Sequence, residues 1–136
     1  MWRYEHAVET TASAEAVWRL YSEIGLWTAW DHGLERIALD GPFAAGSRGE
    51  MVFAGQPPLA FVLTEVRPGA GFVDETTVPG VGTVRFRHTL APNEAGGTRI
   101  VHVVEVEGPA AAAVGPQITE DVPAAMATLA HLAEGR

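Results

Sequence analysis

The sequence predicts an α+β fold in which a curved antiparallel sheet of seven strands wraps around a long C-terminal helix. Two observations predict it. Between residues 34 and 108, six short apolar segments are separated by turns rich in glycine and proline, a pattern typical of an antiparallel meander. In the segment Gln117–Glu134, by contrast, the apolar residues recur at helical spacing and gather on one side. At 1.5 Å per residue this helix would be about 27 Å long, enough to cross a small domain.

The N-terminal segment adds one strand and two short helices. Residues 2–10 alternate between apolar and polar side chains, which predicts a half-buried strand. Ser13 is the expected N-cap of the helix that follows, with Glu15 in its first turn, where the helix dipole favours an anion. A second short helix carries Trp27 and Trp30. The two helices therefore lie between the first and second strands.

The meander supplies the other six strands. They are expected at Leu34–Leu39, Ser47–Phe53, Leu59–Val66, Phe72–Val78, Thr83–Leu90 and Arg99–Glu107. In the C-terminal helix, Pro123 lies on the polar side, where water can satisfy the carbonyl of Thr119. We therefore expect a kink at Pro123 and not a break.

The composition limits the classes of function. A chain of 136 residues that is 47% hydrophobic and 19% charged predicts one globular domain over residues 1–136. The net charge is −8 and the arginines are scattered, so we expect no nucleic-acid partner. The chain has no cysteine for thiolate chemistry and no lysine for Schiff-base chemistry. It has no apolar run that could span a bilayer and no signal-peptide pattern, so we expect a cytoplasmic protein without membrane insertion.

The last two strands allow their register to be predicted. A turn centred on Ala95 pairs Leu90 with Ile100, Phe86 with Val104, Val84 with Val106 and Arg85 with Glu105. The same register places His88 opposite His102 on the apolar face. His6 has that parity on the first strand, which in such folds can lie beside the last one. Up to three imidazoles therefore share an interior surface.

Particular residues also carry a family resemblance. They are Ser13–Trp18, Trp27, Trp30-Asp31, Asp40–Phe43 with Gly46, Thr64–Val66 before Pro68, His88, Gly96–Arg99, Gly108-Pro109 and Leu129–Ala133. Together with the element order, the chain resembles the START/Bet v 1-like superfamily, in the branch named polyketide cyclase/dehydrase. The resemblance covers essentially the whole chain and implies the helix-grip fold. It also implies a deep cavity between the sheet and the C-terminal helix that holds a lipid, a polyketide or another apolar molecule.

Two functions follow from this resemblance and from the histidines. The first is binding of a small hydrophobic ligand, with His88 and His102 as polar anchors for a ligand carbonyl or hydroxyl. The alternative is an enzyme of the cyclase, dehydratase or aromatase type, in which the same histidines transfer protons. A third interpretation is structural, because two core histidines can satisfy each other or a backbone group.

Further residues are expected to line the cavity. They are Phe86, Tyr4, His6, Trp30, Phe61, Met126 and Leu129. The tryptophans pack against the sheet more often than they bind a cofactor, and a buried Tyr4 hydroxyl more often finds a backbone partner than a ligand.

Several acidic and histidine residues have two interpretations. Asp31 and His32 either line the mouth of the cavity or cap a helix and face solvent, and the second is favoured. Glu35 and Glu65 have inward parity, but a bulge that turns them to the surface is favoured. The three imidazoles lack a close metal-binding pair, so we predict no metal.

The remaining expectations concern cofactors and partners. The short glycine turns do not match a dinucleotide fingerprint, so no cofactor is expected. A small hydrophobic molecule is the expected partner. The sequence leaves open whether the chain forms a homodimer.

Overall fold

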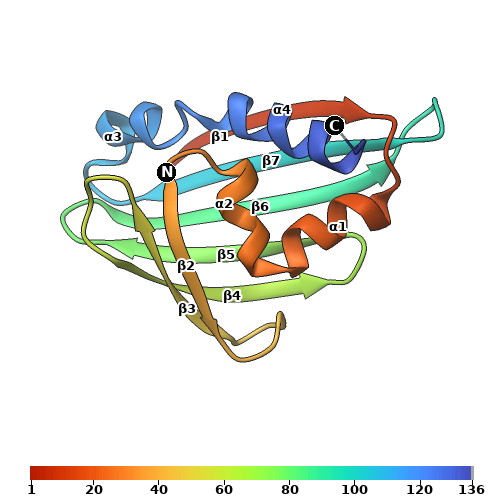
Figure 1. Ribbon diagram of the computed structural model, residues 1–136. Helices are drawn as coiled ribbons and strands as arrows, with labels where there is room; N and C mark the ends of the chain where they lie inside the picture. The colour runs from red at the N-terminus through yellow and green to blue at the C-terminus, as the bar shows by residue number, and fades with distance from the viewer. Residues whose placement is uncertain (136) are drawn as a thin grey trace.

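The computed structural model describes residues 1–135 and confirms the predicted fold class. One antiparallel sheet has the strand order β1-β7-β6-β5-β4-β3-β2, so the N-terminal strand pairs with the last one (Figure 1). The strands are β1 (Trp2–Thr10), β2 (Leu34–Asp40), β3 (Arg48–Phe53), β4 (Leu59–Arg67), β5 (Gly71–Val78), β6 (Gly82–Pro92) and β7 (Thr98–Glu107). Each predicted strand is present and differs by at most two residues at either end, because the Gly- and Pro-containing turns end the strands.

Two helices and a 3-10 turn connect β1 to β2. These are α1 (Ala14–Ser22), η1 (Ile24–Leu26) and α2 (Trp27–Trp30). Ser13 is the N-cap of α1, as predicted, and its hydroxyl accepts a hydrogen bond from the Ala16 amide at 3.1 Å. In Figure 1, α1 and α2 lie in front of the middle strands, and α4 (Val122–Ala133) runs along β1.

The C-terminal segment differs from the prediction in where its helix begins. The structure has two helices, α3 (Ala111–Ile118) and α4, so the last helix starts at Val122 and not at Gln117. The apolar spacing continues across the break, which is why the pattern predicted one helix. Pro123 lies in the first turn of α4, where its missing amide costs no internal hydrogen bond, and it begins the helix instead of kinking it.

Helix α3 was not predicted, since Ala110–Ala113 was expected only to approach the last helix. Gly115 explains its position. A Cβ atom on Gly115 would lie 2.3 Å from the Trp2 indole ring, so only glycine allows α3 to pack this closely on β1.

The core lies between the helices and the inner face of the sheet. Alternate residues of each strand point inward, and the register aligns them into rows that cross the sheet. One row runs from His6 through His102 and His88 to Phe72. The next row contains Tyr4, Val104, Phe86, Asp74 and Leu63. These two rows carry the candidate site.

Candidate functional site

The two histidines of the last hairpin meet on the inner face. His88 and His102 are paired across β6 and β7, as the sequence register predicted. Their ring centroids are 4.6 Å apart, and the side chains are only 4% and 1% exposed. Both imidazoles therefore face the interior.

His102 is held by a tyrosine of α1. The Tyr21 hydroxyl lies 2.7 Å from His102 Nε2, and Tyr21 is fully buried. Burial lowers the pKa of His102 to about 3, with a smaller contribution from His6, so the ring is neutral near pH 7. The hydrogen bond fixes the orientation of this imidazole and uses its Nε2 atom.

His88 is held by aromatic stacking and a backbone carbonyl. Its ring stacks between Phe72 and Phe86, at centroid distances of 3.9 and 4.6 Å. His88 Nδ1 lies 3.3 Å from the carbonyl oxygen of Phe72, which can only accept a hydrogen bond, so Nδ1 carries the hydrogen. Burial lowers the pKa of His88 well below its usual value, and neighbouring His102 lowers it further. Nε2 of the neutral ring is therefore an acceptor, and it has no partner within residues 1–135.

Asp74 is an inward-facing carboxyl that the sequence analysis missed. It lies on β5 directly opposite Phe86 on β6 and Leu63 on β4, and it is 6% exposed. No side chain or amide of residues 1–135 forms a hydrogen bond with its carboxyl group. Burial, together with smaller contributions from the charges of Asp31 and Glu75, raises the pKa of Asp74 to about 8. Asp74 is therefore mainly protonated near pH 7 and presents an O–H donor.

Asp31 and His32 lie in the loop after α2. Asp31 caps the C-terminus of α2, its amide donating to the Trp27 carbonyl at 2.8 Å. The pKa of Asp31 is raised to about 6, mainly because the carboxyl group is buried. The nearby charge of His32 opposes this increase, and the charge of Asp121 adds to it. His32 is exposed and its Nε2 lies 2.7 Å from the hydroxyl of Thr128 on α4. The loop thus joins α2 to α4, and Asp31 is close enough to Asp74 to influence its ionisation.

Aromatic side chains occupy the space where the resemblance implied a deep cavity. Tyr21, Trp27, Trp30 and Phe72 are each at most 4% exposed, and their rings lie 5.0–6.4 Å from neighbouring aromatic rings. The Trp27 indole also donates to the Tyr21 carbonyl at 2.7 Å. The centre of the inner face is therefore packed by α1 and α2, whereas α4 packs on β1 and on these two helices.

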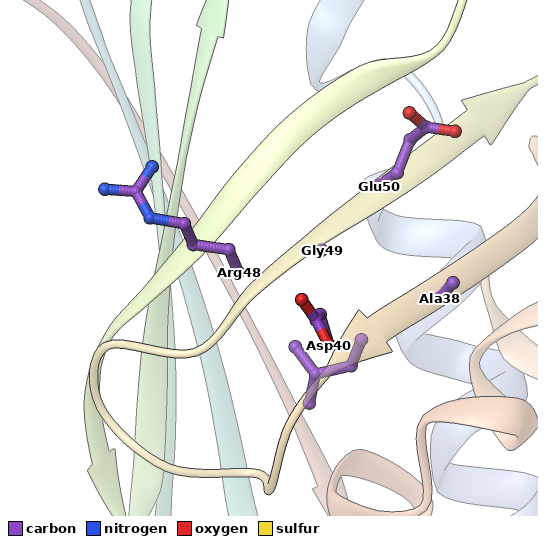
Figure 2. Close-up of a pocket in the computed structure, with 6 residues that line it drawn as sticks. Ala38, Asp40, Arg48, Gly49 and Glu50 are labelled. Atoms are coloured by element: carbon purple, nitrogen blue, oxygen red, sulfur yellow. The ribbon is translucent and has the colours of Figure 1, made fainter.

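The pockets that the structure describes lie elsewhere. One is an open hollow at the end of β2 and the start of β3 (Figure 2), lined by Ala38, Leu39, Asp40, Arg48, Gly49 and Glu50. The second lies at the turn between β6 and β7, lined by Glu9, Pro92, Asn93, Glu94, Ala95 and Arg99. Both are open surface hollows with charged walls, unsuited to an apolar ligand.

The other expected cavity residues divide into two groups. Trp30, Phe61, Met126 and Leu129 are buried in the core. Tyr4, His6 and Phe86 lie in the two inner rows and stay partly exposed. His88, His102 and Phe86 are brought together, with ring centroids at most 5.5 Å apart.

Glu35 and Glu65, whose strand positions left open whether they point inward, lie on the surface, which was the favoured prediction. β-Bulges occur at both positions, between Leu34 and Arg36 and between Leu63 and Glu65. Glu35 is exposed, and Glu65 forms an ion pair with Arg87 at 3.2 Å. Within residues 1–135 no group of three His, Asp or Glu side chains is arranged to hold a metal ion.

Replacing Tyr21 by Phe tests how much the hydrogen bond between the Tyr21 hydroxyl and His102 Nε2 stabilises the protein. We expect Tyr21→Phe to lower the free energy of unfolding by about 1–3 kcal/mol, because Nε2 of the buried His102 loses its partner. Tyr4→Phe is the matched control, since the half-buried Tyr4 hydroxyl has no partner within residues 1–135 and should change stability by less than about 0.5 kcal/mol. Urea unfolding measures both; equal stability of the two variants would contradict a structural role for the Tyr21 hydroxyl.

The curved sheet, the two inserted helices and the C-terminal helix define a helix-grip protein of the START/Bet v 1-like class. A family model described as "Polyketide cyclase / dehydrase and lipid transport" matches residues 1–134. The chain belongs to that family. No curated protein matches it in sequence.

Solved structures agree with this fold. Protein MLL2253 from Mesorhizobium loti is 17% identical, with a TM-score of 0.80 over 98% of this chain and 97% of that one. Ara h 8.0201 is 12% identical, with a TM-score of 0.78 over 99% of both chains. Norcoclaurine synthase from Thalictrum flavum is 20% identical, with a TM-score of 0.74 over 99% of this chain and 87% of that one. At these identities the similarity shows the fold alone. No helix within residues 1–135 has the length and apolar character needed to cross a membrane.

Proposed function

We propose that the protein binds a small hydrophobic molecule, such as a lipid, a polyketide or an aromatic metabolite, against the inner face of its sheet. The observation that carries this proposal is the pair of unpartnered polar groups among apolar side chains. His88 Nε2 is an acceptor and the Asp74 carboxyl is a donor, and both are more than nine-tenths buried. Every fully buried side-chain nitrogen and oxygen of residues 1–135 has a hydrogen-bond partner, so these two unpaired groups are still accessible and a ligand can pair with them.

The partly exposed rings indicate where the ligand lies. Tyr4 and Phe86 flank Val104 in the row that also contains Asp74, and both rings are accessible. The centre of the face is packed by Tyr21 and Phe72. The ligand therefore lies over β7 and β6 beside these rings, next to the surface of β1 on which α4 packs, and not in a deep cavity beneath α4.

Fluorescence titration with aminoanthracene, an uncharged aromatic probe, tests the proposal. We expect saturable binding, and Phe86→Ala should weaken it about 3- to 10-fold, the loss of one aromatic contact. Phe53→Ala is the control, because Phe53 also packs partly exposed against the core but lies on β3. Its affinity should stay within about two-fold of the wild type. Absence of saturable binding, or equal effects of the two substitutions, would contradict the proposed site.

One observation favours an enzymatic alternative of the cyclase, dehydratase or aromatase type. An acceptor nitrogen on His88 and a protonated carboxyl on Asp74 lie in adjacent rows of one face, and such a base and acid can transfer protons. The discriminating result is a turnover lost in His88→Ala while the affinity for the substrate stays similar. A protein that only binds would lose affinity and show no turnover.

A further inference from the structure

We propose that the molecule bound at this site is an uncharged carbonyl compound whose oxygen accepts a hydrogen bond from Asp74, and that free carboxylates such as fatty acids are rejected. This inference rests on the proposed function and names the chemical class of its ligand. It depends on two features of the inner face: the position of Asp74 and, among residues 1–135, the absence of arginine side chains from this face.

Asp74 points at the region where the ligand is placed. It lies between Phe86 and Leu63 in its row, with the His88 ring in the next row. Its side chain is 6% exposed, and its carboxyl group forms no hydrogen bond within residues 1–135 while staying accessible to a ligand. In its protonated form it donates one hydrogen bond, and a ketone, aldehyde or ester oxygen is the acceptor that suits a donor in apolar surroundings.

The arginines of residues 1–135 are turned away from this face. Arg85 and Arg87 lie on the outer face and form ion pairs with Glu75, Glu105 and Glu65. The others are exposed: Arg3, Arg19, Arg36, Arg48, Arg67 and Arg99. The chain contains no lysine. A ligand carboxylate would therefore be buried without a cation.

The carboxylates close enough to affect Asp74 are Asp31 and Glu75. Asp31 lies in the loop after α2, and Glu75 follows Asp74 on β5 but points to the outer face, where it pairs with Arg85. The histidines nearby are neutral near pH 7 because burial lowers the pKa of both His88 and His102. An anionic ligand would thus be repelled by these carboxylates and would lose its hydration without gaining a cation. A neutral carbonyl avoids both free-energy costs.

Three naphthalenes substituted at the same ring position test this inference. The first is acetylnaphthalene, which carries a neutral carbonyl. The second is naphthoic acid, whose carboxyl group is fully ionised in an assay at about pH 6.5. The third is isopropylnaphthalene, which has no hydrogen-bond acceptor. Displacement of aminoanthracene reports the affinity of each. We expect the ketone to bind at least about ten-fold more tightly than the acid, and several-fold more tightly than the hydrocarbon.

Substitutions at Asp74 assign the preference to this residue. Asp74→Asn keeps a neutral donor and should retain the ketone preference, whereas Asp74→Leu removes the donor and should make ketone and hydrocarbon bind equally. Asp40→Asn, at an exposed carboxylate on the far edge of the sheet, is the control and should behave as the wild type. Thermal melts of each variant confirm that it is folded.

The outcomes separate the two proposals. If none of the three compounds displaces the probe and the probe itself does not bind, the proposed function fails. If all three bind with similar affinity, or naphthoate binds best, the protein binds hydrophobic molecules but the carbonyl inference is wrong. Loss of the ketone preference in Asp74→Asn would also overturn it, because the amide keeps the donor.

Discussion

Asp74→Asn is expected to make the protein more stable than the wild type at neutral and alkaline pH. Burial raises the pKa of Asp74 to about 8 in the folded protein, whereas in the unfolded chain it is near 3.8, the ordinary value for aspartate. Between these values the folded state holds a proton that the unfolded state has released, so the stability of the wild type falls by about 1.4 kcal/mol for each pH unit of increase. Asparagine does not ionise and removes this loss.

The advantage of Asp74→Asn should therefore grow by about 3–4 kcal/mol between pH 5 and pH 8 and level off above the folded pKa. Urea unfolding at several pH values measures it. Asp40→Asn replaces an exposed carboxylate in the same way and should show no such trend. A constant difference between Asp74→Asn and the wild type across this range would mean that Asp74 is ionised in the folded protein. If Asp74→Asn instead stabilises the protein by the expected amount, the carboxyl group is kept for function at the expense of stability.

The sequence was sufficient to predict the strands and the register of the last hairpin. The pairing of Phe86 with Val104 and of His88 with His102 follows from alternation and a turn at Asn93–Gly97, which are local features. The surface positions of Glu35 and Glu65 were favoured for the right reason, because a bulge at each position reverses its parity. Local patterns thus predicted the inner face well.

Features that depend on three-dimensional packing were not predicted. Asp74 has the parity of Phe72 and Thr76, so alternation along β5 contained a signal for an inward carboxyl, but only the pairing of β5 with β6 places it beside Phe86 and His88. The contact of Tyr21 with His102 joins residues 81 positions apart, and no sequence pattern specifies it. The same holds for the aromatic rings that fill the expected cavity, because their volumes matter only once α1 and α2 are placed on the sheet.

Asp74 and His88 together give the inner face an unusual chemical state near pH 7. The acid is mainly protonated and the base is neutral, both because burial disfavours their charged forms. Each group destabilises the fold on one side of neutrality, the carboxyl at higher pH and the imidazole at lower pH. A neutral donor and a neutral acceptor on one face suit an uncharged polar ligand, and a hydrophobic pair at these positions would serve stability better.

His88→Phe should reveal the second half of this balance. The pKa of His88 in the folded protein lies well below 6.5, its value in the unfolded chain, so below about pH 6.5 the unfolded chain binds a proton that the folded protein does not. The stability of the wild type should then fall by about 1.4 kcal/mol relative to His88→Phe for each pH unit of decrease, until the folded protein also binds the proton. His102, Asp31 and Asp74 titrate in both proteins, so their contributions cancel to first order in the difference.

Phenylalanine is the appropriate replacement because the ring of His88 stacks between Phe72 and Phe86, and an aromatic ring keeps that packing. At pH 7 the variant should be less stable than the wild type by about 1 kcal/mol, the loss of the hydrogen bond to the Phe72 carbonyl. The order should reverse as the pH falls below 6.5, and His131→Gln, at an exposed position on α4, is the control for loss of an imidazole outside the core. If His88→Phe stays less stable than the wild type by the same amount at every pH, then the folded protein does not hold His88 neutral below pH 6.5, and the buried, uncharged imidazole described here is wrong.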